Sequence, residues 1–131
     1  MSLAEHFLKM PDGKSHGLRF GHATLLQIEK ALDLSLSEIT VAMSAGKVGV
    51  TQCAAILAAG INSFNRKHGV KGVMSQEAAC DLMDELGTPD KAMLPIIKMF
   101  AESMESEEDA AETTEETAAT QAGPKEQTGG E

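Results

Sequence analysis

The sequence is poor in aromatic residues: it has no tryptophan or tyrosine, and its four phenylalanines leave aromatics at 3% of 131 residues. Recognition through aromatic anchors or stacked bases is therefore disfavoured. Basic residues are also few, 11 against 20 acidic ones, and the net charge of −9 disfavours nucleic acids and anionic membranes as direct partners. No apolar run reaches the roughly 18 residues of a membrane span, and no signal-peptide core follows Met1. We expect a cytoplasmic protein.

Motifs that would carry catalysis are missing as well. The sequence has neither a glycine-rich phosphate loop nor a zinc-protease motif. Cys53 and Cys80 fall in separate predicted helices without the spacing of a zinc or redox pair, so we expect buried free thiols. His6 and His16 could face each other across a hairpin and join His22 at a metal, but surface histidines are the favoured interpretation. We predict no catalytic residue, no metal site and no cofactor, and hence no enzyme.

The negative charge is concentrated at the C-terminus. Residues 105–131 hold nine acids and one lysine, a net −8, whereas residues 1–104 hold eleven acids and ten bases, a net −1. The 105–131 segment has no Leu, Ile, Val, Met or Phe to offset an ordering cost of about 1–2 kcal/mol per residue. We therefore expect a domain at 1–104 and a disordered acidic tail at 105–131, of which the first turn could extend a helix.

The first twenty residues are typical of a β-hairpin. Short runs at 5–10 and 15–20 flank Pro11-Asp12-Gly13-Lys14, in which proline, aspartate and glycine favour a tight turn. An isolated hairpin is only marginally stable in water, so we expect its apolar residues to rest on the helices that follow.

Helical spacing and capping signals occupy the rest of the domain. Helices are expected at about 22–33, from the Ser35–Glu38 capping box to Gly46, from Thr51 to Gly69, from Ser75 to Gly87, and from Thr88 onward. Pro95 is expected to kink the last helix or to mark its true start. The predicted fold is mainly α (α+β): an N-terminal β-hairpin followed by four or five short helices.

The helix predicted from Thr51 has the clearest pattern. An apolar stripe at steps of three and four consists of Cys53, Ile56, Leu57, Gly60, Ile61 and Phe64. The other face is small or polar and includes Gln52, Ala55, Ala59, Asn62 and Ser63.

Methionines gather in the last quarter of the predicted domain, at Met83, Met93, Met99 and Met104. Methionine fills irregular gaps in a core, and it is also frequent on surfaces that accept several partners. The last helix is the least enclosed by neighbouring chain. We therefore take four of its apolar residues as candidate partner-binding residues: Met93, Ile97, Phe100 and Met104.

The order of segments carries a resemblance. A hairpin ending in Gly17-Leu18-Arg19-Phe20 precedes Leu26-Gln27-Ile28-Glu29-Lys30-Ala31-Leu32, and later segments are Ala58-Ala59-Gly60-Ile61, Ser75-Gln76-Glu77-Ala78-Ala79 and Leu82-Met83-Asp84-Glu85-Leu86-Gly87. Over roughly residues 5–104 this order resembles the small tail protein family of gene transfer agents and siphophages. That family is placed among the phage tail-assembly chaperones and is also labelled a phage tail tube protein.

The resemblance implies a non-enzymatic chaperone of phage, prophage or gene transfer agent origin. Such a protein binds the tape-measure protein, keeps that long helical polypeptide soluble, and helps to recruit tail tube subunits in the host cytoplasm. The resemblance carries over no functional residue by position. A structural tail tube or other virion component, and a small helical regulatory adaptor, remain as alternatives, and self-association of the chain stays open.

Overall fold

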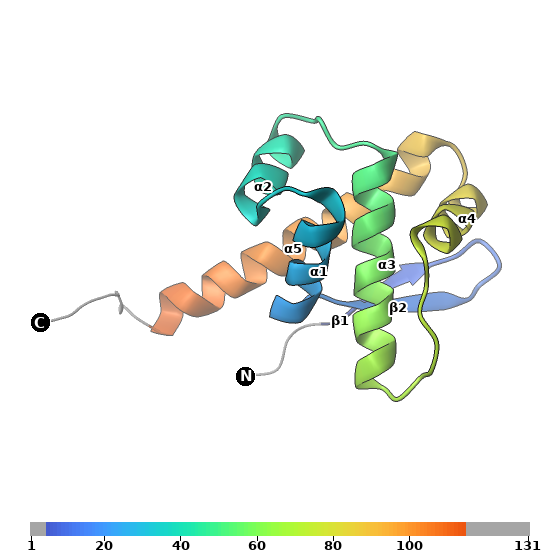
Figure 1. The fold of residues 1–131 in the computed structure, drawn as a ribbon, viewed down its shortest axis with the longest axis horizontal. Helices are drawn as coiled ribbons and strands as arrows, with labels where there is room; N and C mark the ends of the chain where they lie inside the picture. The colour runs from blue at the N-terminus through green and yellow to red at the C-terminus, as the bar shows by residue number, and fades with distance from the viewer. Residues whose placement is uncertain (1–4, 115–131) are drawn as a thin grey trace, which may run out of the picture. The chain divides into compact units, whose positions relative to one another are not determined.

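The computed structural model describes the backbone of residues 5–114 and the side chains of residues 5–104. The chain divides into two units, Met1–Phe100 and Ala101–Glu131. Its elements are β1 (Glu5–Lys9), β2 (Ser15–Arg19), α1 (His22–Leu32), α2 (Leu36–Ser44), α3 (Val50–Lys67), α4 (Gln76–Leu86) and α5 (Pro89–Thr114) (Figure 1). The predicted mainly α (α+β) fold, a hairpin followed by five helices, is confirmed.

The hairpin is a two-stranded antiparallel sheet whose register decides which side chains share a face. His6 lies opposite Leu18, and Leu8 lies opposite His16. The two histidines therefore lie diagonally on one face, so the possibility that they face each other directly across the hairpin is not realised. Leu8 and Leu18, between them on that face, are buried in the core.

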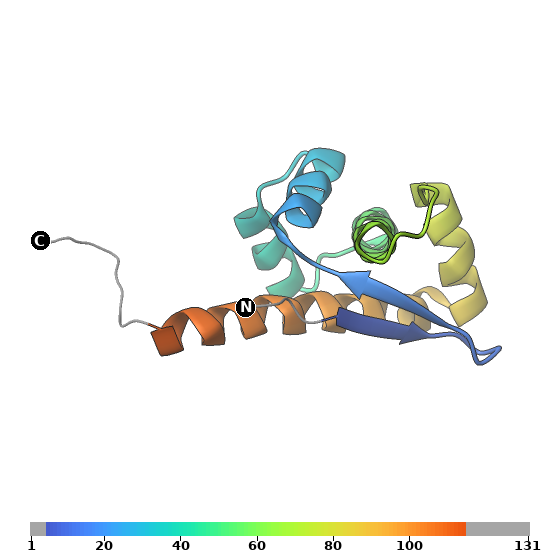
Figure 2. The ribbon, with the colours of Figure 1, turned by 90° about the horizontal axis from the view of Figure 1, so that it is seen from below.

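Helix α3 is the centre of the first unit. It packs against β2, α1 and α4. Figures 1 and 2 show α1 on one side of α3, α4 on the other, and the hairpin crossing beside it. The predicted apolar stripe is confirmed: its members are buried except Phe64, which is half-buried.

Close approach between α3 and β2 depends on small residues. A Cβ at Gly60 would lie 2.9 Å from Leu18 Cδ2 and 3.0 Å from the Phe20 ring. A Cβ at Gly17 would collide with the Phe64 ring. The strand thus lies directly on the helix, and one face of α3 is fully used by the core.

Capping interactions define the helix ends that the sequence signals predicted. Ser35 Oγ accepts from the Glu38 backbone N–H at 3.1 Å, and Glu38 Oε1 accepts from the Ser35 N–H at 2.9 Å. The Glu29 carboxylate accepts from the Leu36 N–H at 2.6 Å, which ties the start of α2 to α1. Ser75 caps α4 by accepting from the Ala78 N–H at 3.0 Å.

Helix α5 begins at Pro89, so Pro95 lies inside it and does not mark its start. The helix continues to Thr114, beyond the boundary expected at 104, and carries the first part of the acidic segment. The remainder of the predicted tail, residues 115–131, lies outside the described residues. None of the described helices is both long enough and apolar enough to cross a membrane.

Candidate functional site

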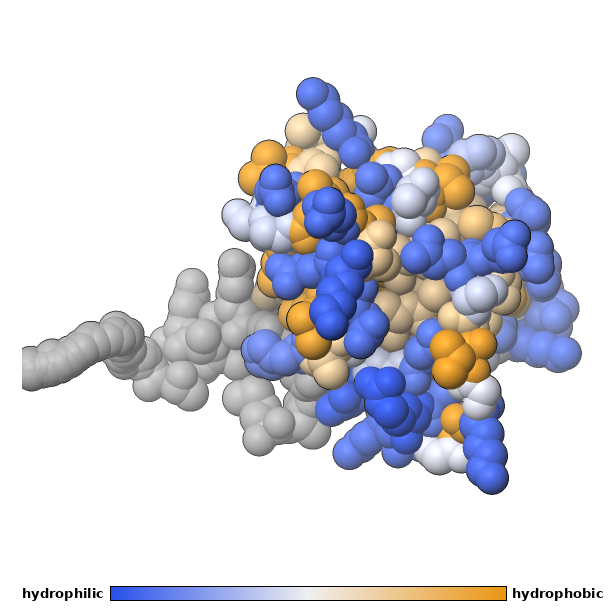
Figure 3. Space-filling view, viewed as in Figure 1, coloured by the Kyte–Doolittle hydropathy of each residue, from blue (hydrophilic) through white to orange (hydrophobic). Residues whose placement is uncertain are grey.

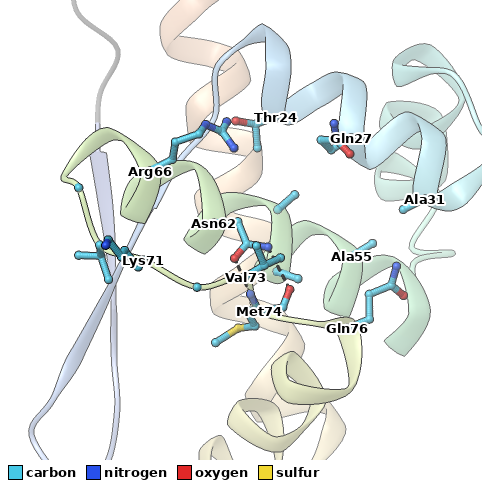
Figure 4. Close-up of a pocket in the computed structure, with 15 residues that line it drawn as sticks. Thr24, Gln27, Ala31, Ala55, Asn62, Arg66, Lys71, Val73, Met74 and Gln76 are labelled. Atoms are coloured by element: carbon cyan, nitrogen blue, oxygen red, sulfur yellow. Dashed lines mark hydrogen bonds between the residues drawn. The ribbon is translucent and has the colours of Figure 1, made fainter.

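A groove of about 680 Å³ lies along the face of α3 opposite the apolar stripe, where Ala55 and Ala58 are buried and Ala59 is half-buried. Its walls come from α1 on one side and from the linker between α3 and α4 on the other, as Figure 4 shows. In the space-filling view, weakly hydrophobic surface over α3 is bordered by hydrophilic side chains (Figure 3). The groove lies within the first unit of the chain.

The floor of the groove is a helical stripe of mostly small residues. Ala55, Ala58, Ala59, Asn62 and Arg66 line it, at steps of three and four along α3. Because three of these side chains are single methyl groups, another backbone can approach α3 closely there. From Ala55 to Arg66 the stripe is about 16 Å long at 1.5 Å per residue, which is about three helical turns.

The linker wall is fixed to α3 by one side chain. The Asn62 amide donates to the Met74 carbonyl at 3.0 Å, and the Met74 N–H donates to Asn62 Oδ1 at 2.7 Å (Figure 4). The Asn62 side-chain amide thus pairs with both the N–H and the carbonyl of Met74, as the backbone of a neighbouring β-strand would. The linker is therefore held against α3 at Met74 although it has no secondary structure of its own.

The same linker exposes apolar side chains at the rim of the groove. Val73 is 88% exposed and Val70 is 53% exposed, and both line the groove. Gly72, immediately before Val73, has φ +102°, a conformation that side-chain-bearing residues rarely adopt. The backbone thus turns Val73 outward, where the first unit gives it little to pack against.

Some polar side chains of the groove already have hydrogen-bond partners within the chain, whereas others have none among the described residues. The Thr24 hydroxyl, in the α1 wall, is buried; it donates to the Arg19 carbonyl at 3.2 Å and accepts from the Gly21 N–H at 3.3 Å. Gln27 in the same wall is exposed. Arg66 extends from α3 toward α1 in Figure 4, and Lys71 lies in the linker. Within residues 5–104 neither cation has a carboxylate partner.

The residues chosen from the sequence as a partner face lie elsewhere, on α5. Phe100 is fully buried, with its ring centroid 5.4 Å from that of Phe20 in an edge-to-face arrangement. Phe100 is therefore a core residue, and its assignment to a partner face is wrong. Met93 and Ile97 are half-buried, and Met104 belongs to the second unit.

The cysteines and His22 are candidates for metal binding or thiol chemistry, and the structure shows how far each is buried. Both cysteines are free, as predicted; Cys53 is buried in the core, whereas Cys80 is partly exposed, which corrects the expectation that both are buried. Burial raises the pKa of the Cys53 thiol to about 11, so it stays protonated near neutral pH. His22 is exposed, and no cluster of three potential metal ligands occurs in the part of the chain that the structure describes.

Sequence reasoning noted the small and polar face of α3 but assigned it no role. Its signal is the spacing of Ala55, Ala58, Ala59 and Asn62 opposite a continuous apolar stripe. The linker wall could not be placed from the sequence, because its position depends on the Asn62 amide contacting a residue twelve positions away. The groove is thus a product of tertiary packing.

The lining of the groove combines apolar and polar groups. It offers methyl groups, exposed valines, amides and two cations, and no cysteine or histidine is among its lining residues. Such a surface suits a helix with one apolar face. No family model, no curated protein and no solved structure matches the chain.

Proposed function

We propose that this protein is a phage tail-assembly chaperone whose α3 groove covers helical segments of a tape-measure protein. The observation that carries the proposal is a groove about three turns long, floored by alanines and rimmed by exposed valines, on the element that organises the fold. The segment order, which resembles the small tail proteins of gene transfer agents and siphophages, supports the same role.

The physical argument concerns an unassembled helical polypeptide. Its apolar stripes would aggregate if left in water, and a bound groove removes them from solvent. A floor of methyl groups lets the backbone of a target helix approach α3 closely, so binding depends on the size of the target's contact side chains and not on one particular sequence. The rim valines would exchange water for partner atoms, at about 25 cal/mol per Å² of apolar area buried.

The charge of the chain supports the solubilising part of the role. Each bound copy adds a net charge of −9 at pH 7 to the complex, concentrated in residues 105–131. Copies coating one polypeptide would repel other coated complexes and so oppose aggregation. The proposed setting is the host cytoplasm during tail assembly, where tail tube subunits are further proposed partners.

The test is co-expression with the protein encoded by the longest predicted helical reading frame downstream of this gene. We expect a soluble complex with many copies of this chain per partner, measured by pull-down and size-exclusion chromatography. The Ala59→Leu variant, which fills the groove at a half-exposed position, should lose the complex. Ala23→Leu makes the same change at an exposed position of α1 outside the groove and should retain it.

Three outcomes would contradict the proposal. If the partner stays insoluble while this protein elutes alone, the chaperone role is rejected and a regulatory adaptor becomes the better explanation. If the purified protein forms rings or tubes, a structural tail tube component is indicated. If Ala59→Leu and the wild-type chain recover the partner equally, the α3 groove is not the binding site.

A further inference from the structure

The two ends of the α3 groove differ in charge, because Arg66 and Lys71 both lie toward one end. A proposal about the partner follows from this difference and rests on the proposed function. We propose that the groove selects partner helices that carry small residues on the contact stripe and acidic residues at the end that meets Arg66 and Lys71. The partner is defined by this chemistry: an amphipathic helix with alanine-sized contacts and a carboxylate-bearing terminus.

The size requirement follows from the floor and the rim. Ala55 and Ala58 are buried and Ala59 is half-buried, so the floor is narrow and Ala59 is its most accessible alanine. The walls limit the width, because the linker is pinned to α3 through Asn62 and cannot move away without breaking two hydrogen bonds. A partner helix with small residues on its stripe can lie deep enough to touch floor and both walls at once.

The charge requirement follows from the cations. Arg66 lies in the last turn of α3, where the helix dipole alone would favour a cation. Lys71 lies beyond the helix end in the linker, so the dipole does not account for it. Both line the groove, and no acidic residue does.

The positive end of the groove belongs to a domain whose other residues are net negative. Residues 1–104 carry a net −1, or −3 without Arg66 and Lys71, so these two cations place local positive charge on a net negative domain. Because neither cation has an ion-pair partner within residues 5–104, a partner carboxylate would not have to displace one. An Arg fork also binds a carboxylate in a defined orientation, which would set the direction of the bound helix.

The experiment measures binding of dye-labelled helical peptides to the full chain by fluorescence anisotropy. Each peptide has about 20 residues, enough for a stable helix, with alanines at every contact position. Acidic pairs are placed at the N-terminal end in one peptide and at the C-terminal end in another. Matched peptides carry lysine or glutamine in place of the acids, and one further acidic peptide has leucines in place of the alanines.

We expect one acidic alanine-stripe peptide to bind at least about fivefold more tightly than its glutamine counterpart, and the lysine counterpart to bind most weakly. This advantage should shrink as salt is raised, because the pairs lie near solvent. In the double variant Arg66→Glu/Lys71→Glu the order should reverse, so that the lysine peptide binds best. Lys14→Glu/Lys47→Glu, which reverses two exposed charges outside the groove, should keep the wild-type order.

Equal binding of acidic, neutral and basic peptides, blocked by Ala59→Leu, would overturn the charge requirement while leaving helix binding intact. Equal or tighter binding of the leucine-stripe peptide would overturn the size requirement. If no peptide binds, and Arg66→Glu/Lys71→Glu converts a dimer of the free chain into a monomer, the groove is a self-association surface. That result would overturn both this proposal and the proposed function.

Discussion

Replacing Asn62 with alanine should release the linker wall of the groove at a measurable cost in stability. The substitution removes two hydrogen bonds to the Met74 backbone, of 3.0 and 2.7 Å, and leaves the Met74 N–H and carbonyl to find other partners. At about 0.5–1.5 kcal/mol net for each bond, the loss is about 1–3 kcal/mol. Alanine is also the better helix former, which returns roughly 0.6 kcal/mol.

Asn65→Ala supplies the matched control. Asn65 lies on the same helix and is similarly half-buried, and its side chain makes no hydrogen bond to the described residues. Both variants gain the same helix propensity, so their difference isolates the two bonds to Met74. Urea unfolding followed by circular dichroism should place Asn62→Ala about 1–3 kcal/mol below Asn65→Ala, a midpoint difference of about 1 M for a small domain.

Amide hydrogen exchange gives a second readout at the bond itself. The Met74 N–H should be protected in the wild-type chain and in Asn65→Ala, and should exchange fast in Asn62→Ala. Equal stability of the two variants within about 0.5 kcal/mol, together with an unprotected Met74 N–H in the wild-type chain, would refute the reasoning. The linker would then have to be held by its apolar contacts.

Three further changes test the core. Phe100→Ala should lower the free energy of unfolding by about 3–5 kcal/mol in a denaturant titration, because Phe100 is fully buried against Phe20. Gly17→Ala should cost about 1–3 kcal/mol in the same assay, because the new methyl group collides with a ring of α3; an unchanged midpoint would show that this ring moves freely. Cys53, whose pKa is raised from 9.0 to about 11 by burial, should resist thiol reagents near pH 8 until the chain unfolds. The unfolded thiol ionises first, so the stability that this group contributes is present below pH 9 and is lost as pH rises toward 11; Cys53→Ala should show a smaller loss.

The hairpin and the helices were predictable because their signals are local. The Pro11–Lys14 turn, the Ser35–Glu38 capping box and the Ser75 cap each lie within four or five residues of sequence, and each appears in the structure. The apolar stripe of α3 is a similar case, since helical periodicity alone identifies a face that must be buried.

The binding surface was not predictable in the same way. Apolar spacing on α5 does not distinguish a core face from a partner face, and Phe100 proved to belong to the core. The α3 groove exists because α1, which precedes α3 by a whole helix, and the linker that folds back after α3 lie on either side of its alanines. An alanine stripe on a predicted helix indicates that another segment packs closely against it. Only the tertiary arrangement shows that no segment of the described chain fills the groove over the α3 alanines.

Site-specific photo-crosslinking tests most directly whether a helical partner binds in this groove. A photoreactive amino acid is placed at Gln27, in the α1 wall, or at Leu94, which is 67% exposed on α5, and each variant is co-expressed with the proposed tape-measure partner. We expect crosslinks to the partner from position 27, and their loss when Ala59→Leu is added. Crosslinks from position 94 alone would contradict binding in the α3 groove and return the partner face to α5.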